Sequence, residues 1–408
     1  MRAVERHKAS SSTAATGTCR TIEVSRKKID MDLLYECGKG ARFQIAEVIG
    51  RGRRGLVRAA VDTHTGERVA IKKISDIFEH VSDAIRILRE IKLLRLLRHP
   101  DIVEIKHIIL PSSPTDFKDI FIVFELMESD LHQVIMDNED LTQEHHRFFL
   151  YQLLRALKYL HTGPFLSVVY LSFIFDWGVN FISKLTLMVL FFLLANVIHR
   201  DLKPKNILAN ADCKLKIDNF NLSRASFSDA SSSIFWNVCD VLMMLCSFSY
   251  PFIKLSYTPE IDIWSIGCVF AEMLTRKPLF PGKNMLHHMD LITNLLGTPS
   301  AESIAGVRNA NARKYLSGMQ KKKPVPFSQK FPGLDPLGVS LLERLLAFDP
   351  NCRPSAKEAL ADPYFHGLAN VDHEPTAQPI SKVHFEFEKR KLTKEDVREL
   401  IYREVERI

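Results

Sequence analysis

The feature that most restricts the fold is the glycine-rich stretch at residues 50–57, whose three glycines and valine follow the pattern G-x-G-x-x-G-x-V. The segments 43–50 and 55–62 on either side of its turn are rich in apolar and β-branched residues, which predicts two strands. Glycines in such a turn let backbone N–H groups approach phosphate oxygens closely. A dinucleotide-binding fingerprint would instead open a helix. The stretch therefore predicts a strand–turn–strand unit whose backbone can approach a phosphate closely.

Strand-like segments fill the first part of the chain. Residues 67–74 and 119–127 are again apolar and β-branched, and they predict further strands. Between them, apolar residues recur every three or four positions from Ala84 to Leu97, which predicts an amphipathic helix. This part of the chain is expected to form a small lobe dominated by a sheet.

Helices are expected to dominate the rest of the chain. Residues 144–161 have an amphipathic pattern, whereas 258–274 are largely apolar and predict a buried helix. Further helices are predicted at 340–348 and 393–405, and a loop rich in Pro and Gly at 324–336. The order of the elements predicts an α+β protein with a small sheet-rich lobe followed by a larger helical lobe.

The strongest chemical signal is the stretch HRDLKPKN at residues 199–206, which holds an Asp, a Lys and an Asn within six residues. Phosphoryl transfer uses three such groups: a carboxylate that orients the attacking hydroxyl, a cation beside the phosphoryl group, and an amide oxygen for Mg²⁺. Upstream, Lys72 follows the end of the glycine-rich stretch by 15 residues and precedes Glu90 of the predicted helix by 18. A Lys and a Glu so placed are typical of phosphoryl-transferring ATP sites.

Together these motifs resemble eukaryotic protein kinases, and most closely mitogen-activated protein kinases of the plant type. The resemblance is carried further by ELMESDLHQVI, ILANADCKLKI, DIWSIGCVFAEMLTRKPLFPGKN, LLGTPSAES and LLAFDPNCRPSAKEALADPYF. Apart from two gaps it extends from about Phe43 to Glu404. It implies a two-lobed kinase fold, with ATP and Mg²⁺ as cofactors and transfer of the γ-phosphate to Ser or Thr of protein substrates in a signalling cascade.

The resemblance also implies roles for individual residues. Lys72 would hold the α- and β-phosphates and pair with Glu90. Asp201 would orient the substrate hydroxyl and Lys203 would stabilise the γ-phosphoryl group, as the catalytic residues. Asn206 would bind Mg²⁺. The expected ATP-binding residues lie in the glycine-rich stretch, the next strand and helix, and the segment facing adenine: Ile49, Gly50, Arg51, Gly52, Arg53, Arg54, Gly55, Leu56, Val57, Lys72, Glu90, Glu125 and Met127.

An acidic segment near the C-terminus, LANVDHEP at residues 368–375, looks like the docking motif by which this family binds basic segments of its activators and substrates. Asp372 and Glu374 are its candidate docking residues, and a short acidic loop without function is the open alternative. The resemblance implies an upstream mitogen-activated protein kinase kinase and protein substrates as partners, and a monomer.

The second proposed metal ligand departs from the family pattern. Asn219 stands where the resemblance places the Asp of the D-F-G motif, and Asn221 stands where it places the Gly. An Asn offers one neutral oxygen, whereas Mg²⁺ favours charged carboxylate oxygens. The exchange predicts a degraded metal site and a loss of roughly three to five decades in rate. Arg53 and Arg54 depart from the pattern at the tip of the glycine-rich stretch.

Two longer segments have no counterpart in the family. Residues 163–194 are rich in Phe and Leu, but Asp176 and Lys184 divide them into apolar runs shorter than the roughly 20 residues of a membrane span. Residues 237–256 replace the T-x-Y and A-P-E region of the activation segment. Because the A-P-E Glu is missing, Arg353 is expected to be buried without its partner, at a cost of about 3–5 kcal/mol.

Both segments favour residues with uracil-rich codons, which suggests that they are translated intron. Transcripts of the same gene would then join Thr162 directly to Ala195. Peptides from residues 163–194 recovered at normal abundance would contradict this hypothesis. Three functional readings remain open: an active kinase, a catalytically impaired docking protein, and a mis-spliced isoform without function.

Composition indicates the class of the protein and its cellular location. A hydrophobic content of 46% and a net charge of +7 without long basic runs predict a globular protein that does not bind nucleic acid. Seven cysteines without metal-ligand spacing and the absence of an apolar signal core favour the cytoplasm or nucleus. The predicted domains are a disordered or extended segment 1–42, a kinase domain 43–365 with lobes at about 43–127 and 128–365, and a C-terminal extension 366–408.

Overall fold

The computed structural model describes residues 42–407 except for several internal segments: 53–54, 110–112, 114, 116, 162–193, 228–257, 308–309, 371, 373 and 378–379. The predictions for residues 1–41, for the insertion up to residue 193 and for 237–256 fall outside the described residues, as do Arg53 and Arg54. The chain divides into two compact units. The first holds the described residues up to Ile77, Lys106–Leu126 and those from Ile401, and the second holds Phe78–Ile105 and Met127–Leu400.

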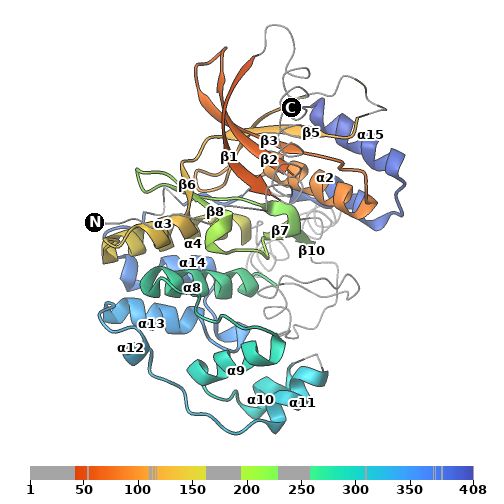
Figure 1. Ribbon diagram of the computed structural model, residues 1–408. Helices are drawn as coiled ribbons and strands as arrows, with labels where there is room; N and C mark the ends of the chain where they lie inside the picture. Colours follow the sequence, from red (N-terminus) through yellow and green to blue (C-terminus); the bar gives the residue numbers. More distant parts are fainter. Residues whose placement is uncertain are drawn as a thin grey trace, which may run out of the picture. The chain divides into compact units, whose positions relative to one another are not determined.

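The first unit is built on a five-stranded sheet of order β1-β2-β3-β5-β4 (Figure 1). Its strands are β1 (Phe43–Gly52), β2 (Gly55–Asp62), β3 (Arg68–Ile74), β4 (Ile105–Ile109) and β5 (Ile120–Glu125). The pairs β1–β2, β2–β3 and β3–β5 are antiparallel. Apolar side chains from four strands form its core: Phe43, Ala60, Val69, Ile71, Phe121 and Val123. The strands predicted from the sequence are therefore confirmed.

The second unit is largely helical. Its helices are α2 (Val81–Leu96), α3 (Leu131–Asp137), α4 (Gln143–His161), α8 (Glu260–Thr275), α9 (Met285–Leu296), α10 (Ala301–Ala305), α11 (Ala310–Gly318), α12 (Phe327–Lys330), α13 (Pro336–Leu345), α14 (Ala356–Leu360) and most of α15 (Lys394–Val405). Two small sheets complete it, with orders β10-β7-β11 and β6-β8-β9. Their strands are β6 (Ser129–Asp130), β7 (Leu194–Ile198), β8 (Ile207–Ala209), β9 (Leu215–Ile217), β10 (Arg224–Phe227) and β11 (Ile380–Ser381).

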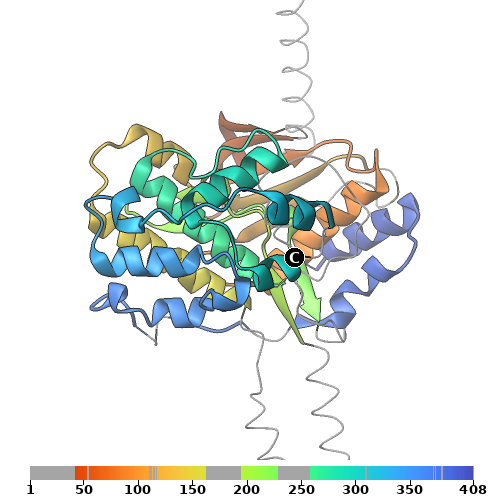
Figure 2. The same ribbon diagram turned by 90° about the horizontal axis from the view of Figure 1, so that it is seen from below.

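Helix α8 forms the centre of the second unit. It packs against α4 and α13, and both views show these helices side by side (Figure 1 and Figure 2). Most of its residues are buried, including Trp264 and Phe270, as its apolar sequence predicts. Helix α2 buries the apolar stripe from Ala84 to Leu97 that predicted it.

The predicted loop at 324–336 is partly wrong, because it contains the single turn of α12. Phe327 and Phe331 are both buried there, and their rings lie 5.8 Å apart across the turn. This apolar pair stabilises a helical turn despite the surrounding prolines. None of the helices that the structure describes combines the length and apolar character that a bilayer crossing demands.

Candidate active site

One buried carboxylate, that of Asp262 in α8, fixes the start of the loop at residues 199–206, called the catalytic loop below. Its two oxygens accept the backbone N–H groups of His199 and Arg200, each at 2.8 Å. His161 at the end of α4 adds a contact of 2.9 Å through Nε2. Burial alone would raise the pKa of the Asp262 carboxyl, but the bonds from His161 and Arg200 hold this pKa below its usual value. Asp262 therefore stays charged and shapes the turn in which Arg200 adopts a φ of 69°.

His199 is fully buried and joins the catalytic loop to the segment that follows β9. Its Nε2 donates to the carbonyl of Asp218 at 3.0 Å, and its Nδ1 accepts the N–H of Asp201 at 3.3 Å. Burial lowers the pKa of His199, although the Asp262 carboxylate opposes this shift, so the ring is neutral. The ring also meets Phe220 edge to face, with centroids 4.8 Å apart. These contacts set the spacing between the two segments.

The two residues predicted as catalytic lie together on this loop. Lys203 Nζ is 3.0 Å from both carboxylate oxygens of Asp201. Asn206 Nδ2 donates to Oδ2 of Asp201 at 2.8 Å and to its backbone carbonyl at 2.7 Å. The side chains of Asp201 and Lys203 are 14% and 42% exposed, so a substrate can reach them. A carboxylate beside a mobile cation can orient a hydroxyl group and stabilise developing negative charge.

A chain of side-chain amides continues from Asn206. Its Oδ1 accepts a hydrogen bond from Asn219 Nδ2 at 3.1 Å, and Asn219 Oδ1 accepts one from Asn221 Nδ2 at 2.6 Å. Asn219 has the left-handed conformation, with φ 67° and ψ 64°, which Asn tolerates better than most residues. The N–H of Asp218 donates to the carbonyl of Asn206 at 2.9 Å, so the backbones of the two segments are also joined.

The arrangement of Asn206 and Asn219 does not fit Mg²⁺. This cation requires oxygen ligands in a strict geometry and favours carboxylates. Here the amide oxygen of each residue already accepts a hydrogen bond, and Asn219 directs its NH₂ group at Asn206. In the part of the chain that the structure describes, no group of three or more His, Cys, Asp and Glu side chains could hold a metal ion. The predicted ligands thus lie together, but as an amide pair.

In the first unit, the register of the sheet places Lys72 of β3 opposite Val57 of β2. Residues opposite one another in antiparallel strands project to the same face, so Lys72 lies on the face of the glycine-rich stretch. Its Nζ is 5.8 Å from the centre of the Phe124 ring. The neighbouring Lys73 projects to the other face, where Asp119 binds it at 2.8 Å. The sheet therefore presents Lys72, and not Lys73, beside the glycine-rich stretch.

The remaining predicted ATP-binding residues are distributed over both units. They are Ile49, Gly50, Arg51 and Gly52 in β1, Gly55 and Leu56 in β2, Glu125 at the end of β5, and the buried Glu90 and Met127. Glycine is required at position 55 for a structural reason, because a Cβ there would lie 2.2 Å from the carbonyl oxygen of Lys73. Only glycine allows β2 and β3 to approach so closely at this point.

Two arginines that were not predicted as functional lie together, Arg89 on α2 and Arg224 on β10. Arg89 is 3% exposed, and its Nε donates to Glu388 in the helical turn η6 (Lys382–Lys389). Arg224 of β10 lies 3.9 Å from the same carboxylate. Burial and the nearby charge of Arg89 lower the pKa of Arg224 to about 10, while Glu388 opposes that shift. One carboxylate of the C-terminal extension thus holds two guanidinium groups.

Arg353 is buried, as predicted, but backbone carbonyls take the place of the carboxylate partner. Three backbone carbonyls accept its guanidinium N–H groups, those of Ala347 at 2.8 Å, Glu260 at 2.9 Å and Phe348 at 3.2 Å. The guanidinium carbon lies 4.7 Å from the centre of the Trp264 ring. Burial lowers the pKa of Arg353 to about 10, with the charge of Glu260 opposing, so Arg353 remains charged. Two carbonyls in the segment after α13 and one at the start of α8 therefore accept its N–H groups, and a buried guanidinium needs such acceptors.

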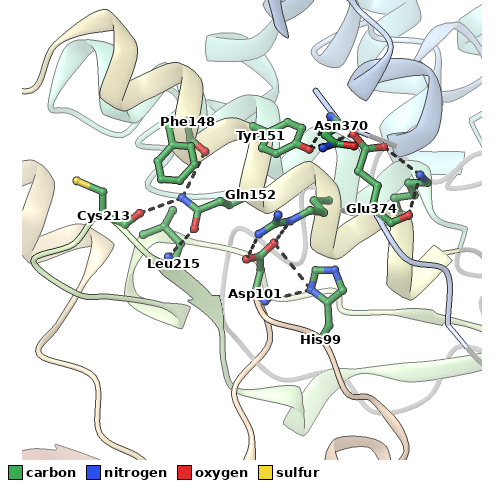
Figure 3. A network of polar contacts seen from close by, with 11 residues as sticks. His99, Asp101, Phe148, Tyr151, Gln152, Cys213, Leu215, Asn370 and Glu374 are labelled. Atoms are coloured by element: carbon green, nitrogen blue, oxygen red, sulfur yellow. Dashed lines mark hydrogen bonds and ion pairs between the residues drawn. The ribbon is translucent and has the colours of Figure 1, made fainter. Parts of the chain in front are cut away.

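The proposed docking segment is tied to α4 by a buried contact (Figure 3). Glu374 accepts hydrogen bonds from Tyr151 Oη at 3.1 Å and from Lys158 Nζ at 3.0 Å, and its carbonyl also accepts from Lys158. Asn370 donates its backbone N–H to the same Tyr151 hydroxyl at 3.3 Å. Glu374 is buried, whereas Asp372 is exposed. The two acidic residues therefore have different surroundings, and only Asp372 faces solvent.

The same helix holds the strand that leads to Asn219 (Figure 3). Gln152 of α4 donates to the carbonyl of Cys213 at 2.9 Å and accepts the N–H of Leu215 at 3.0 Å. One turn further on, Arg155 binds both carboxylate oxygens of Asp101 at 2.6 Å. Residues of α4 thus position β9 and the loop beside it through side chains far apart in the sequence.

Asp262 and Glu388 were both missed by the sequence analysis. Asp262 did have a signal, because a carboxylate within an otherwise apolar helix must be paired when it is buried. Glu388 has no local signal, since it lies in a segment with several other charged residues and its partner Arg89 lies 299 residues away.

The sequence was compared with known families and proteins. The protein kinase domain family matches residues 43–170 and 177–365. Mitogen-activated protein kinase 14 of Oryza sativa subsp. japonica is 61% identical over 382 residues, which cover 92% of this chain and 64% of that protein. Mitogen-activated protein kinase 15 of the same plant and mitogen-activated protein kinase 9 of Arabidopsis thaliana are each 60% identical over 92% of this chain, and over 69% and 68% of their own lengths. The chain spans 58% to 69% of the length of the curated relatives it matches.

Proposed function

Because the chain belongs to the mitogen-activated protein kinase family, we propose that it is an ATP-dependent serine/threonine kinase that phosphorylates protein substrates. The observation that supports this activity best is the pairing of Asp201 with Lys203, each Nζ–O distance being 3.0 Å. This pair lies on a loop that the buried charge of Asp262 anchors. The catalytic loop is therefore rigid where the reacting groups need to be positioned.

In this proposal Asp201 orients the hydroxyl of a substrate Ser or Thr and holds the proton that leaves it. Lys203 stabilises the negative charge of the transferred phosphoryl group, and its exposure leaves Nζ free to move from Asp201 toward phosphate. Lys72 holds the α- and β-phosphates of ATP from the face of the glycine-rich stretch. Each role uses a residue whose local geometry supports it.

The family also implies Mg²⁺, which would neutralise phosphate charge when bound. Asn206 and Asn219 lack the carboxylate that this role requires, and their amide groups face one another. We therefore propose a slow enzyme with a degraded D-F-G motif, roughly three to five decades below one with a complete metal site.

A second candidate function is that of a non-catalytic docking protein, which the amide pair at Asn206 and Asn219 favours. Its binding surface would be centred on Asp372, whose exposed carboxylate can attract a basic peptide. The expected partners are an upstream mitogen-activated protein kinase kinase and protein substrates. As finer proposals, the chain is of the plant subgroup in which the T-x-Y tripeptide reads T-D-Y, although residues 237–256 replace that region here. It acts as a monomer in the cytoplasm or nucleus, and its kinase domain is at 43–365.

Phosphate transfer from labelled ATP to a Ser-Pro peptide tests the kinase proposal. The full chain should label the peptide slowly, and Asp201→Asn should reduce labelling by at least about 100-fold, because it removes the carboxylate that takes the proton. Labelling that Asp201→Asn leaves unchanged would come from another enzyme and would contradict the proposal.

Two adjacent lysines provide a matched control for nucleotide binding. Lys72→Met should abolish the rise in melting temperature that ATP causes in the full chain. Lys73→Met should lower the melting temperature of the free protein, because it breaks the ion pair with Asp119, while the effect of ATP is retained. Loss of the ATP effect in both variants would remove the assignment of Lys72 to the phosphates.

Binding of a basic peptide to the full chain tests the docking proposal. Asp372→Asn should weaken binding by about two- to fivefold, the usual effect of one exposed charge pair. Glu374→Gln should instead lower the melting temperature, because Lys158 would lose its buried carboxylate partner. Unchanged affinity in Asp372→Asn would show that the peptide binds elsewhere.

A further inference from the structure

We infer that Asn206, Asn219 and Asn221 form a one-way chain of amides that closes the cation position. The protein would therefore bind nucleotide without a divalent cation. That a nucleotide binds to this protein rests on the proposed function. The inference goes beyond the loss of one ligand, because it assigns a role to Asn221 and a direction to every bond.

The direction of the chain is set at Asp201. A carboxylate and a carbonyl can only accept hydrogen bonds, so the group of Asn206 that faces the Oδ2 and carbonyl of Asp201 is its NH₂. Its Oδ1 must then face Asn219, which presents its own NH₂ at 3.1 Å. The remaining oxygen of Asn219 faces the NH₂ of Asn221 at 2.6 Å. No amide in this series can turn over without placing two donors or two acceptors together.

The amide chain excludes a cation in two ways. Its N–H groups carry partial positive charge, and its oxygens already accept hydrogen bonds. A divalent cation at the oxygens of Asn206 and Asn219 would replace two hydrogen bonds and would lie beside N–H groups that carry partial positive charge. In return the cation would gain two neutral ligands and no carboxylate. Such ligands do not compensate for bound water, which Mg²⁺ gives up reluctantly. The amide oxygens of Asn206 and Asn219 are thus already satisfied by neighbouring amides.

The backbone holds the amides in place before any ligand arrives. Asp218 donates its N–H to the carbonyl of Asn206 at 2.9 Å, and its own carbonyl accepts from the buried His199 at 3.0 Å. These bonds fix Asp218, the residue that precedes the left-handed Asn219. The amide chain is therefore part of the folded site.

Asn221 acts as a positioning residue. With Asn219→Asp alone, the new carboxylate would keep the hydrogen bond from Asn221, and its second oxygen would face the Oδ1 of Asn206. That pair of acceptors favours a cation, but one carboxylate oxygen stays occupied. Adding Asn221→Gly frees this oxygen as well, so the double variant is expected to bind a cation better than the single one.

Titration of the full chain with a fluorescent ATP analogue, in excess EDTA or in excess MgCl₂, tests the inference. The native chain should show Kd values within about twofold of one another in the two buffers, whereas Asn219→Asp/Asn221→Gly should bind at least about tenfold more tightly with Mg²⁺. Asn219→Asp alone should lie between them. A native chain that needs Mg²⁺ as much as the double variant does would overturn the inference.

Two controls separate this inference from the proposed function. Asn210→Asp adds the same charge outside the amide chain, where the side-chain oxygen accepts the N–H of Glu128 at 3.0 Å, and it should behave like the native chain. Binding of Mn²⁺ alone is followed by electron paramagnetic resonance. If no variant binds nucleotide, the proposed function fails, and the inference is then decided by Mn²⁺: equal binding to the native chain and the double variant overturns it, and binding confined to the variant supports it.

Discussion

The two sides of the catalytic loop are held in different ways. At its start, the buried charge of Asp262 accepts the backbone N–H groups of His199 and Arg200. At its end, the neutral amides of Asn206 and Asn219 bond to one another. The first contact fixes the backbone, and the second occupies the side chains that were predicted as metal ligands. The comparison teaches that the shape of this loop and its metal chemistry depend on separate groups, so the second can be lost while the first remains.

The energies of the two sides differ as much as their chemistry. Removing one partner of a buried charged contact costs about 3–5 kcal/mol, whereas a neutral hydrogen bond contributes about 0.5–1.5 kcal/mol. The variants below weaken one side at a time, and they are ordered by the size of the expected effect.

Asp262→Asn should have the largest effect, a loss of about 3–5 kcal/mol in the free energy of unfolding. The new NH₂ group would face a backbone N–H at the start of the loop, and the buried charge that holds His161 would be gone. Chemical denaturation of the full chain measures the loss. A decrease below about 1 kcal/mol would show that Asp262 does not anchor the loop.

Glu388→Gln tests a second charged contact, that between the C-terminal extension and α2. It should cost about 2–3 kcal/mol, because Arg89 is buried and would lose its carboxylate, while Glu388 itself is partly exposed. Glu386→Gln is the matched control on the same turn and should leave the unfolding midpoint nearly unchanged. Equal shifts in the two variants would contradict a specific role for Glu388.

The charged side should also carry a pH dependence. Burial lowers the pKa of His199 in the folded state below its unfolded value of about 6.5, so between the two values the unfolded chain binds the proton and the folded chain does not. Stability is then lost as pH falls below about 6.5, by up to about 1.4 kcal/mol per pH unit for this residue.

His199→Asn should remove the contribution of His199 to the slope of the unfolding free energy against pH. The Oδ1 of the new Asn can still accept the N–H of Asp201, but the Asn does not titrate. The measurement compares unfolding free energies of the two proteins at pH 7 and pH 5. The other histidines are common to both proteins, so parallel curves would show that His199 is not the titrating group.

Asn219→Gly should have the smallest effect, about 1 kcal/mol or less, since it removes neutral hydrogen bonds at a partly exposed site and glycine tolerates the left-handed backbone. Circular dichroism should show a fold unchanged from that of the native chain. A loss as large as that of Asp262→Asn would remove the distinction between the two sides.

The sequence predicts best what depends on neighbours along the chain. The apolar spacing from Ala84 to Leu97 predicts α2, and the β-branched runs predict the strands, because period and composition act locally. The predicted catalytic pair, Asp201 and Lys203, was identified from six adjacent residues, and the structure brings the two side chains together.

Contacts between distant segments could not be predicted. The sequence identifies Asn219 as a departure, but not that its NH₂ faces Asn206, because the direction depends on acceptors at Asp201. It identifies Glu374 as acidic, but not that Lys158 buries it. A side chain's surroundings depend on the tertiary structure, and neither charge nor spacing alone determines them.

The pairing of Arg89 with Glu388 has a consequence for biosynthesis. The two residues are 299 positions apart, and Arg89 is made first. At a translation rate of about 5–20 residues per second, the ribosome needs roughly 15–60 s to reach Glu388 after Arg89 has been added. During that time the guanidinium of the nascent helix cannot be buried with this partner, so docking of α2 through this contact waits until Glu388 has been synthesised.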